Sequence, residues 1–228
     1  MIAFNTLYSS LNRTGGKNLW EGCLLASIAH AIMVGVYPEL SSEHSWDGMN
    51  YNMQDLAGCK GTISFFEGGL VAVFQSVDHI NFNNYSLDNI TEFLQGAGEK
   101  IIRVANEEAL QYVLEEVEGK VIPVISSLFW AIGDEVYANS NFNDIIQNGG
   151  YILKYQLQQS KDAIISWREY FDMNEEQVGL TEILFNKKLV SKDNEITLTE
   201  EEKSILINLY GDNLEDCVES LNEMKIYF

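Results

Sequence analysis

One cysteine and one histidine are the residues in this sequence whose types and order could perform chemistry. Cys23 follows Gly22 near the start of an apolar stretch that predicts a helix. A helix N-terminus lowers the pKa of a thiol and exposes its sulfur, so Cys23 could act as a nucleophile. His79 follows a predicted strand and could supply the base, with Asp78 or an asparagine of residues 81–84 orienting it.

This order of a helix-borne cysteine and a later strand-borne histidine resembles that of papain-like hydrolases. The Cys-Trp-Ala-Phe type of sequence that surrounds their cysteine is not found around Cys23. A cysteine-dependent hydrolase that uses Cys23, His79 and Asp78 is therefore one alternative. The other is that Cys23 is a small core residue, because free cysteines are among the most buried residue types.

A metal site would need ligands from distant parts of the chain. Cys23 and His30 share a helix face, but two ligands do not make a site, so His44 and an acid such as Asp47 would have to join them. The sequence has no phosphate-binding loop, no dinucleotide-binding glycine motif, and no HExxH or GxSxG motif. We therefore expect no metal and no cofactor. Asp47 and Asp55 could each serve as a general base, with turn capping as the alternative.

Acidity is the strongest property of the composition. The chain has 34 Asp and Glu against 14 Lys and Arg, which gives a net charge of -20. Phosphate backbones and anionic membranes would repel such a chain, so we expect neither nucleic acid nor membrane as a partner. A basic protein would be attracted, mainly through faster association. The alternative is that the acidity only keeps the protein soluble.

The cysteines and the N-terminus indicate the compartment. Cys23, Cys59 and Cys217 are widely spaced and form no CxxC motif, so they predict reduced thiols rather than a disulfide framework. The first ten residues lack the basic start and the cleavage pattern of a secretory signal. We therefore expect a cytoplasmic protein, and its oligomeric state stays open.

The hydrophobic pattern predicts an α+β fold with a small antiparallel sheet. Residues 18–36 are apolar nearly all round a helical projection, which predicts a buried helix. A hairpin is predicted around 62–74, with a glycine turn at 67–69 and a further strand from 46–53 beside it. The WDG and NY residues of that further strand would lie at the sheet edge.

The second half of the chain has helical spacing. Residues 106–118 predict an amphipathic helix that begins at Asn106 and ends at Gly119, because apolar residues recur at i, i+3, i+4 and i+7. From 160 to the end the pattern is helical, and Thr199 with Glu202 has the spacing of a capping box. We expect one domain, 1–228, with 160–228 as an alternative helical subdomain.

Two groups of residues are candidates for binding a partner. The first lies at the predicted sheet edge, and the second is the acidic face of the predicted helix 106–118. Trp and Tyr often anchor protein interfaces, and carboxylates would attract a basic partner. The alternatives are burial in the core for the aromatic residues and a solvated face for the acids. The candidate residues are Trp46, Asp47, Asn50, Tyr51, Glu107, Glu108, Glu115 and Glu116.

The segment 46–66 resembles bacterial immunity-type proteins, which are small acidic cytosolic proteins that neutralise toxins. The resemblance rests on Trp46-Asp47-Gly48, on Asn50-Tyr51 and on the run from Gly61 to Phe65. It implies a non-enzymatic inhibitor that binds a toxin domain, often a nuclease, through acidic and aromatic residues. We therefore expect an acidic protein-binding module, with the hydrolase and a structural or regulatory domain without activity as alternatives.

Overall fold

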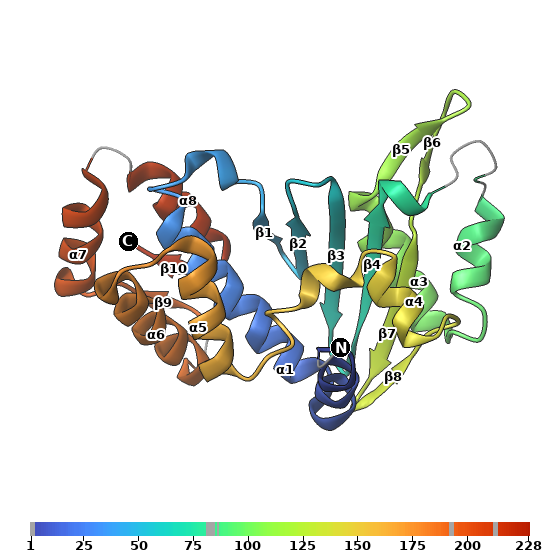
Figure 1. The fold of residues 1–228 in the computed structure, drawn as a ribbon, viewed down its shortest axis with the longest axis horizontal. Helices are drawn as coiled ribbons and strands as arrows, with labels where there is room; N and C mark the ends of the chain where they lie inside the picture. Colours follow the sequence, from blue (N-terminus) through green and yellow to red (C-terminus); the bar gives the residue numbers. More distant parts are fainter. Residues whose placement is uncertain (1–2, 81–84, 86, 192–193, 212–213) are drawn as a thin grey trace. The chain divides into compact units, whose positions relative to one another are not determined.

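The computed structural model describes residues 3–80, 85, 87–191, 194–211 and 214–228. The chain divides into two compact units. We call Met1–Leu19 with Met49–Lys154 the sheet unit, and Trp20–Gly48 with Tyr155–Phe228 the helical unit. The predicted α+β class is confirmed, because the first unit is built on an antiparallel sheet and the second is mainly helical (Figure 1).

Five strands of the sheet unit are antiparallel neighbours in the order β2-β3-β4-β7-β8. The predicted hairpin is confirmed: Phe66 pairs with Gly69 across a turn at Glu67 and Gly68, where Gly68 has a φ of 86° that glycine adopts without strain. The sheet is larger than predicted because β7 and β8 extend it. The strands are β2 (Asn50–Gln54), β3 (Cys59–Phe66), β4 (Gly69–Ser76), β7 (Ser127–Ile132) and β8 (Glu135–Tyr137).

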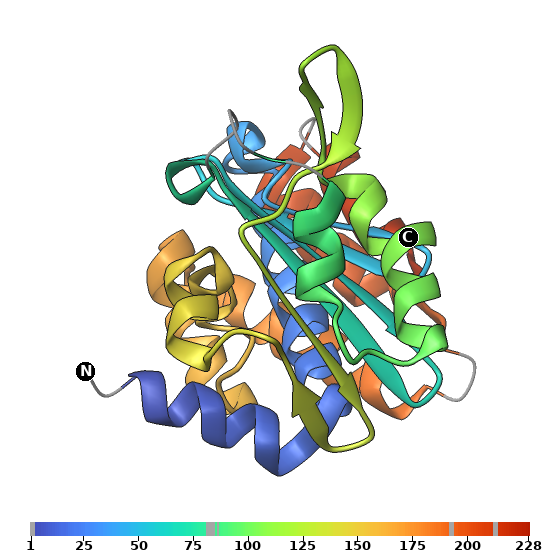
Figure 2. The same ribbon diagram turned by 90° about the vertical axis from the view of Figure 1, so that its right-hand side faces the viewer.

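Two helices, α2 (Leu87–Phe93) and α3 (Glu99–Glu107), cover one face of this sheet (Figure 2). Their apolar residues pack with Val71 and Val73 of β4 and with Trp130 of β7 in one core. The short helices of the sheet unit are η2 (Val77–His79), η4 (Ala109–Tyr112), α4 (Phe142–Gln147) and η5 (Gly150–Leu153).

The predicted helix over 106–118 is wrong. The chain forms α3 before it, then η4, and then the hairpin of β5 (Leu114–Val117) and β6 (Lys120–Pro123), seen at the edge of the sheet unit in Figure 1. Glu118 and Gly119 both have positive φ, which makes the two-residue turn that joins twisted antiparallel strands. Gly119 therefore reverses the chain instead of ending a helix.

The helical unit has a core formed by the C-terminal part of α1 (Ala3–Met33), from Leu24 on, together with the C-terminal helices. The predicted buried helix is confirmed from Leu19 to Met33, which are almost all buried, but the helix begins at Ala3 rather than near residue 18. Among the described residues, no helix is long and apolar enough to cross a membrane. The remaining helices are η1 (Pro38–Leu40), α5 (Ser160–Phe171), α6 (Glu175–Val190), α7 (Glu200–Tyr210) and α8 (Leu214–Glu223).

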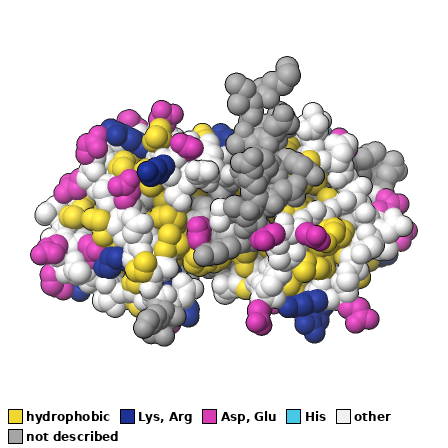
Figure 3. All heavy atoms as spheres, turned by 90° about the horizontal axis from the view of Figure 1, so that it is seen from below, with side chains coloured by type: hydrophobic (Ala, Val, Ile, Leu, Met, Phe, Trp, Pro, Cys, Tyr) yellow, Lys and Arg dark blue, Asp and Glu magenta, His cyan; other side chains and the backbone are white. Residues whose placement is uncertain are grey.

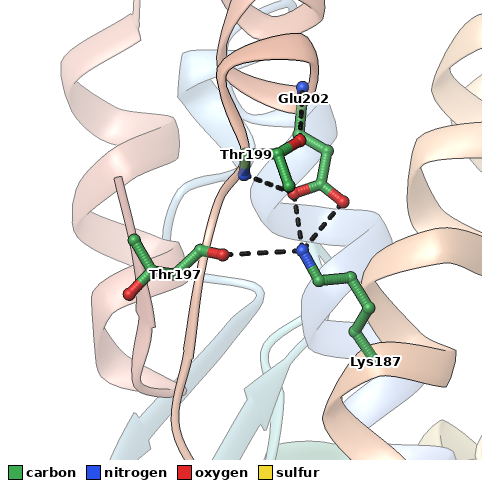
Figure 4. A network of polar contacts seen from close by, with 4 residues as sticks. All are labelled: Lys187, Thr197, Thr199 and Glu202. Atoms are coloured by element: carbon green, nitrogen blue, oxygen red, sulfur yellow. Dashed lines mark hydrogen bonds and ion pairs between the residues drawn. The ribbon is translucent and has the colours of Figure 1, made fainter.

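The short strands of the helical unit are β1 (His44–Asp47), β9 (Ile196–Thr197) and β10 (Ile226–Tyr227), of which β9 and β10 pair in parallel. A polar network fixes α6 against the start of α7 (Figure 4). The Lys187 ammonium donates to both carboxylate oxygens of Glu202, at 2.9 and 2.7 Å. Glu202 in turn accepts from the backbone of Thr199, and this confirms the predicted capping box.

Candidate protein-binding site

A groove of about 650 Å³ lies in the sheet unit between α2, α3 and the end of β6. Its wall is mainly apolar. The apolar side chains that line it are those of Leu87, Ile90, Leu94, Ala97, Ile102 and Pro123. Pockets of this size with a mainly apolar wall are the usual form of binding sites in proteins.

The faces of α2 and α3 explain why the groove is open. Ile101, Val104 and Ala105 of α3 are buried in the core under the helix. Successive side chains of an α-helix are about 100° apart around the helix axis. The side chain of Ile102 therefore points to the side of the core-facing Ile101, lines the groove and stays 39% exposed. Leu87 at the start of α2 is 56% exposed. The helices therefore present apolar side chains that their own core does not use.

The polar groups of the groove are mostly bound within their own helix. Asn106 Nδ2 donates to the carbonyl oxygen of Ile102 at 2.8 Å, and Thr91 Oγ1 donates to that of Leu87 at 3.4 Å. Asn139 closes the end of α2 by donating to three backbone carbonyls, including that of Gln95 at 2.8 Å. The lining thus offers a ligand few donors and acceptors besides the side chains of Glu92 and Gln95.

The hairpin of β5 and β6 continues the apolar surface of the groove. Leu114 pairs with Pro123, which lines the groove, and Val121 is two residues before Pro123 on the same strand. Because side chains alternate between faces along a strand, these three residues share one face of the hairpin. Leu114 is 39% exposed and Val121 is 68% exposed. We call the groove and this hairpin face the apolar strip.

The apolar strip lies in an acidic part of the chain. Residues 87–123 contain eight Asp and Glu against three Lys and Arg. One of the three cations, Lys100, donates to the backbone oxygen of Glu67 at 2.8 Å and lies 4.5 Å from the centre of the Phe66 ring. Figure 3 shows one face of the chain, on which Asp and Glu side chains lie among apolar groups.

Of the acids predicted to bind a partner, Glu107 and Glu116 are exposed. Glu107 is the last residue of α3, and Glu116 pairs with Val121 on the exposed face of the hairpin. Glu115 is half-buried and its carboxylate lies 3.7 Å from the Lys60 ammonium. The structure therefore places Glu116 on the face of the hairpin that belongs to the apolar strip.

The remaining acid, Glu108, contacts another predicted residue. The side chain of Asn50 is buried and donates from Nδ2 to Glu108 at 2.8 Å and to the Tyr112 hydroxyl at 3.2 Å. Its Oδ1 accepts from Ser64 Oγ at 2.6 Å. Tyr51 next to it has no exposed surface. Asn50 and Tyr51 thus lie in the interior of the sheet unit, and the half-buried Glu108 is hydrogen-bonded to Asn50.

Trp46 and Asp47 belong to the helical unit. Trp46 is half-buried, its indole N–H donates to Ser27 Oγ at 2.8 Å, and its backbone N–H donates to a carboxylate oxygen of Glu223 at 2.7 Å. Burial is the main cause that raises the pKa of Glu223, and the nearby carboxylates of Glu219 and Asp47 add to it. Trp46 therefore connects β1 to Ser27 of α1 and to Glu223 of the helical unit. Asp47 is exposed.

The premise for a reactive Cys23 is wrong, because Cys23 lies in the middle of α1 and not near a helix N-terminus. Its thiol is fully buried, and burial raises its pKa well above the usual value. Gly22 has a packing role: a Cβ there would lie 1.8 Å from the carbonyl oxygen of Gln156. A protonated, buried thiol does not favour nucleophilic attack.

The base proposed for Cys23 lies in the sheet unit and has a local partner. His79 is exposed and shares a hydrogen bond of 3.1 Å with Ser76 Oγ through Nδ1. Asp78 beside it is exposed in η2. The asparagines proposed to orient the histidine, at 81, 83 and 84, lie outside the described residues.

The two other histidines form a buried pair in the helical unit. The rings of His30 and His44 lie 5.3 Å apart, His30 Nε2 is 2.8 Å from the Leu40 carbonyl oxygen, and His44 lies edge-on against Trp167. Burial lowers the pKa of both rings. Within the described ranges, no three His, Cys, Asp or Glu side chains come together so that they could hold a metal ion.

The residues of the groove were missed in the sequence because they come from separate segments. Ile102, Leu87 and Pro123 are brought together only by the packing of α2, α3 and β6. One local signal was present: Ile101 and Ile102 are adjacent in a helix, and a helix buries only one of two such neighbours on a narrow core face.

A comparison with protein-family models, curated proteins and solved structures finds no match for this chain.

Proposed function

We propose that the protein is a non-enzymatic, acidic protein-binding module of the cytoplasm that inhibits a basic protein, in the manner of an immunity protein for a toxin domain. The observation that supports the proposal most is the apolar strip in an acidic part of the sheet unit. The resemblance of residues 46–66 to immunity-type proteins supports the same class of function. A basic partner would be drawn in by the carboxylates and held by the apolar contacts.

The two kinds of surface contribute differently to binding. Burial of apolar area gives about 25 cal/mol for each Å² removed from water, so Leu87, Ile102 and Val121 would supply affinity. Long-range attraction by carboxylates raises the association rate and weakens as salt screens it. The same field repels phosphate, and this disfavours nucleic acid as the ligand.

The test compares two variants with equal change in net charge. One replaces four exposed carboxylates of the sheet unit by amides: Glu92→Gln, Glu99→Gln, Glu107→Gln and Glu116→Gln. The control replaces four exposed carboxylates of the helical unit: Glu169→Gln, Glu182→Gln, Glu201→Gln and Glu219→Gln. The probes are small basic proteins, among them a basic ribonuclease, and the measurement is calorimetric Kd at about 50 mM and about 300 mM salt.

We expect the wild type to bind at least one probe at low salt and to bind it more weakly at high salt. The sheet-unit variant should lose about tenfold or more in affinity, and the control about threefold or less. Equal losses in the two variants would show that only the total charge matters. That result, or no binding to any basic probe at low salt, would contradict the proposed function.

A further inference from the structure

We infer that the part of the partner that enters the groove is a basic amphipathic helix. The inference rests on the proposed function and specifies the structure of the bound segment. Its apolar face would contact the apolar strip, and its Lys and Arg side chains would lie toward the carboxylates around it. Three properties of the groove lead to this ligand.

The first property is the small number of free hydrogen-bonding groups in the wall, which are mainly the side chains of Glu92 and Gln95. The backbones of α2 and α3 are engaged in their own helices, and Asn106 and Thr91 bond to carbonyls of the same helix. A segment that enters such a wall must satisfy its own N–H and C=O groups, since a buried unpaired group costs about 1–3 kcal/mol. A helix does this along its whole length, whereas an extended segment needs a neighbouring strand.

The second property is the shape of the apolar surface. The groove is formed along two helices and continues onto the hairpin through Pro123, Leu114 and Val121. This is an elongated apolar surface and not a closed cavity for a compact small molecule. Helices that bind in grooves use apolar anchors at i, i+3, i+4 and i+7, which form a stripe of this kind.

The third property is the charge around the groove. Glu92 is part of the lining, Glu99 begins α3 beside Ile102 on the helix surface, and Glu116 lies on the hairpin face with Val121. Lys100 and Arg103 are exposed cations of α3, but over residues 87–123 the eight Asp and Glu outnumber the three Lys and Arg. The polar flanks of the bound helix would therefore be rich in Lys and Arg.

The probe is a synthetic peptide of about 18 residues, or five helical turns, with Leu at the i, i+3, i+4 and i+7 positions and Lys elsewhere. A scrambled peptide of the same composition has the same charge but no apolar stripe. Fluorescence anisotropy gives the Kd of each peptide, and circular dichroism reports any gain in helix on mixing. The wild type should bind the amphipathic peptide about tenfold or more tightly than the scrambled one, with a gain in helix.

Two variants and one control locate the binding. Ile102→Lys places a cation in the groove, and Thr91→Trp fills it from an exposed position of α2. Ile183→Lys is the control, because Ile183 is a similarly exposed isoleucine on α6 of the helical unit. Both groove variants should raise the Kd for the amphipathic peptide about tenfold, and the control should leave it within about twofold.

The results separate this inference from the proposed function. Equal affinity for both peptides, or unchanged affinity in both groove variants, would overturn the helix as the ligand. If basic proteins still bind and depend on the sheet-unit carboxylates, the proposed function stands with another mode, such as a strand added to the hairpin. Binding of the peptide with a gain in helix, lost in either groove variant that keeps its native circular dichroism, supports the inference.

Discussion

Asn50 of β2 and Glu108 after α3 are joined by a hydrogen bond, in which Asn50 Nδ2 donates to Glu108 Oε2 at 2.8 Å. The bond connects the end of α3 to the sheet beneath it. Because α3 forms one wall of the groove, this contact helps to fix the position of Ile102 and Asn106. Glu108 thus differs from its neighbour Glu107, which is exposed at the end of α3.

Replacing Glu108 should therefore destabilise the protein, while replacing Glu107 should not. Glu108→Ala leaves Asn50 with one acceptor fewer in a buried position, and we expect a loss of about 1–3 kcal/mol in the free energy of unfolding. Glu107→Ala, the matched control, should change it by less than about 0.5 kcal/mol. Urea unfolding followed by tryptophan fluorescence measures both. Equal effects of the two substitutions would show that the hydrogen bond between Glu108 and Asn50 does not contribute to the free energy of unfolding.

The buried pair of His30 and His44 should make the protein sensitive to mild acid. Burial lowers the pKa of both histidines, and the nearby His30 charge lowers that of His44 further. The unfolded chain, with a histidine pKa near 6.5, therefore binds more protons than the folded one below that pH. Stability should fall as the pH drops below about 6.5, by up to about 1.4 kcal/mol per pH unit for each histidine.

The variant His44→Phe keeps a ring against Trp167 but removes one proton site. Urea unfolding at pH values on either side of 6.5 should show a smaller loss of stability on acidification in this variant than in the wild type. An identical pH slope in the two proteins would contradict the prediction.

Glu202 should add a second acid-sensitive contribution at lower pH. Burial alone would raise the pKa of Glu202, but the hydrogen bonds from Lys187 and from the Thr199 backbone outweigh it, and the pKa is lowered. The stabilisation is therefore fully present above the pKa of an unfolded glutamate, near 4.3, and is lost as the pH falls through the lower folded value. Glu202→Gln should cost about 1–3 kcal/mol at neutral pH, because it weakens the hydrogen bonds from Lys187.

The exposed neighbour Glu201 provides the control for Glu202. Glu201→Gln should leave the free energy of unfolding within about 0.5 kcal/mol of the wild type at neutral pH. Glu202→Gln should also flatten the stability profile below about pH 4.3. A profile as steep as that of the wild type would show that other carboxylates cause the acid response.

Lys188 should destabilise the fold at neutral pH. Its side chain is buried, its ammonium donates to the Asn194 carbonyl oxygen, and burial together with the charge of Lys225 lowers its pKa to about 8. The unfolded chain keeps this proton up to a pH near 10.4, so the wild type should gain stability between about pH 8 and 10. Lys188→Met should be more stable at pH 7 and lack this gain. Lys161→Met, on an exposed lysine of α5, is the control in the same unfolding assay.

The sequence predicted the fold best where local patterns agree with the tertiary contacts. The hairpin around 62–74 has alternating apolar residues and turn glycines, and both features survive in β3 and β4. The prediction of a helix from the spacing of Leu110, Val113 and Val117 was wrong. This spacing suits a helix, but it is equally compatible with η4 followed by β5. The turn at Glu118 and Gly119 decides between the helix and the strand, because it lets β5 pair with β6, which follows it in the sequence.

The candidate site was predictable only in its charge. The acidity around Glu107 and Glu116 is visible in the sequence, and the structure places both residues at the surface. The groove depends on how far α2 and α3 are apart and on the position of Pro123, and neither follows from periodicity. Asn50 and Tyr51 show the opposite case, since residues of types common at interfaces are buried here by their strand.

The central claim is that the groove between α2, α3 and β6 binds a basic amphipathic helix. Nuclear magnetic resonance of the isotope-labelled full chain, titrated with the amphipathic peptide described above, tests it most directly. We predict that the largest backbone shift changes fall on residues 90–97, on Ile102 and Asn106, and on Val121. Changes that are confined to the helical unit, or no changes at peptide concentrations well above that of the protein, would contradict the claim.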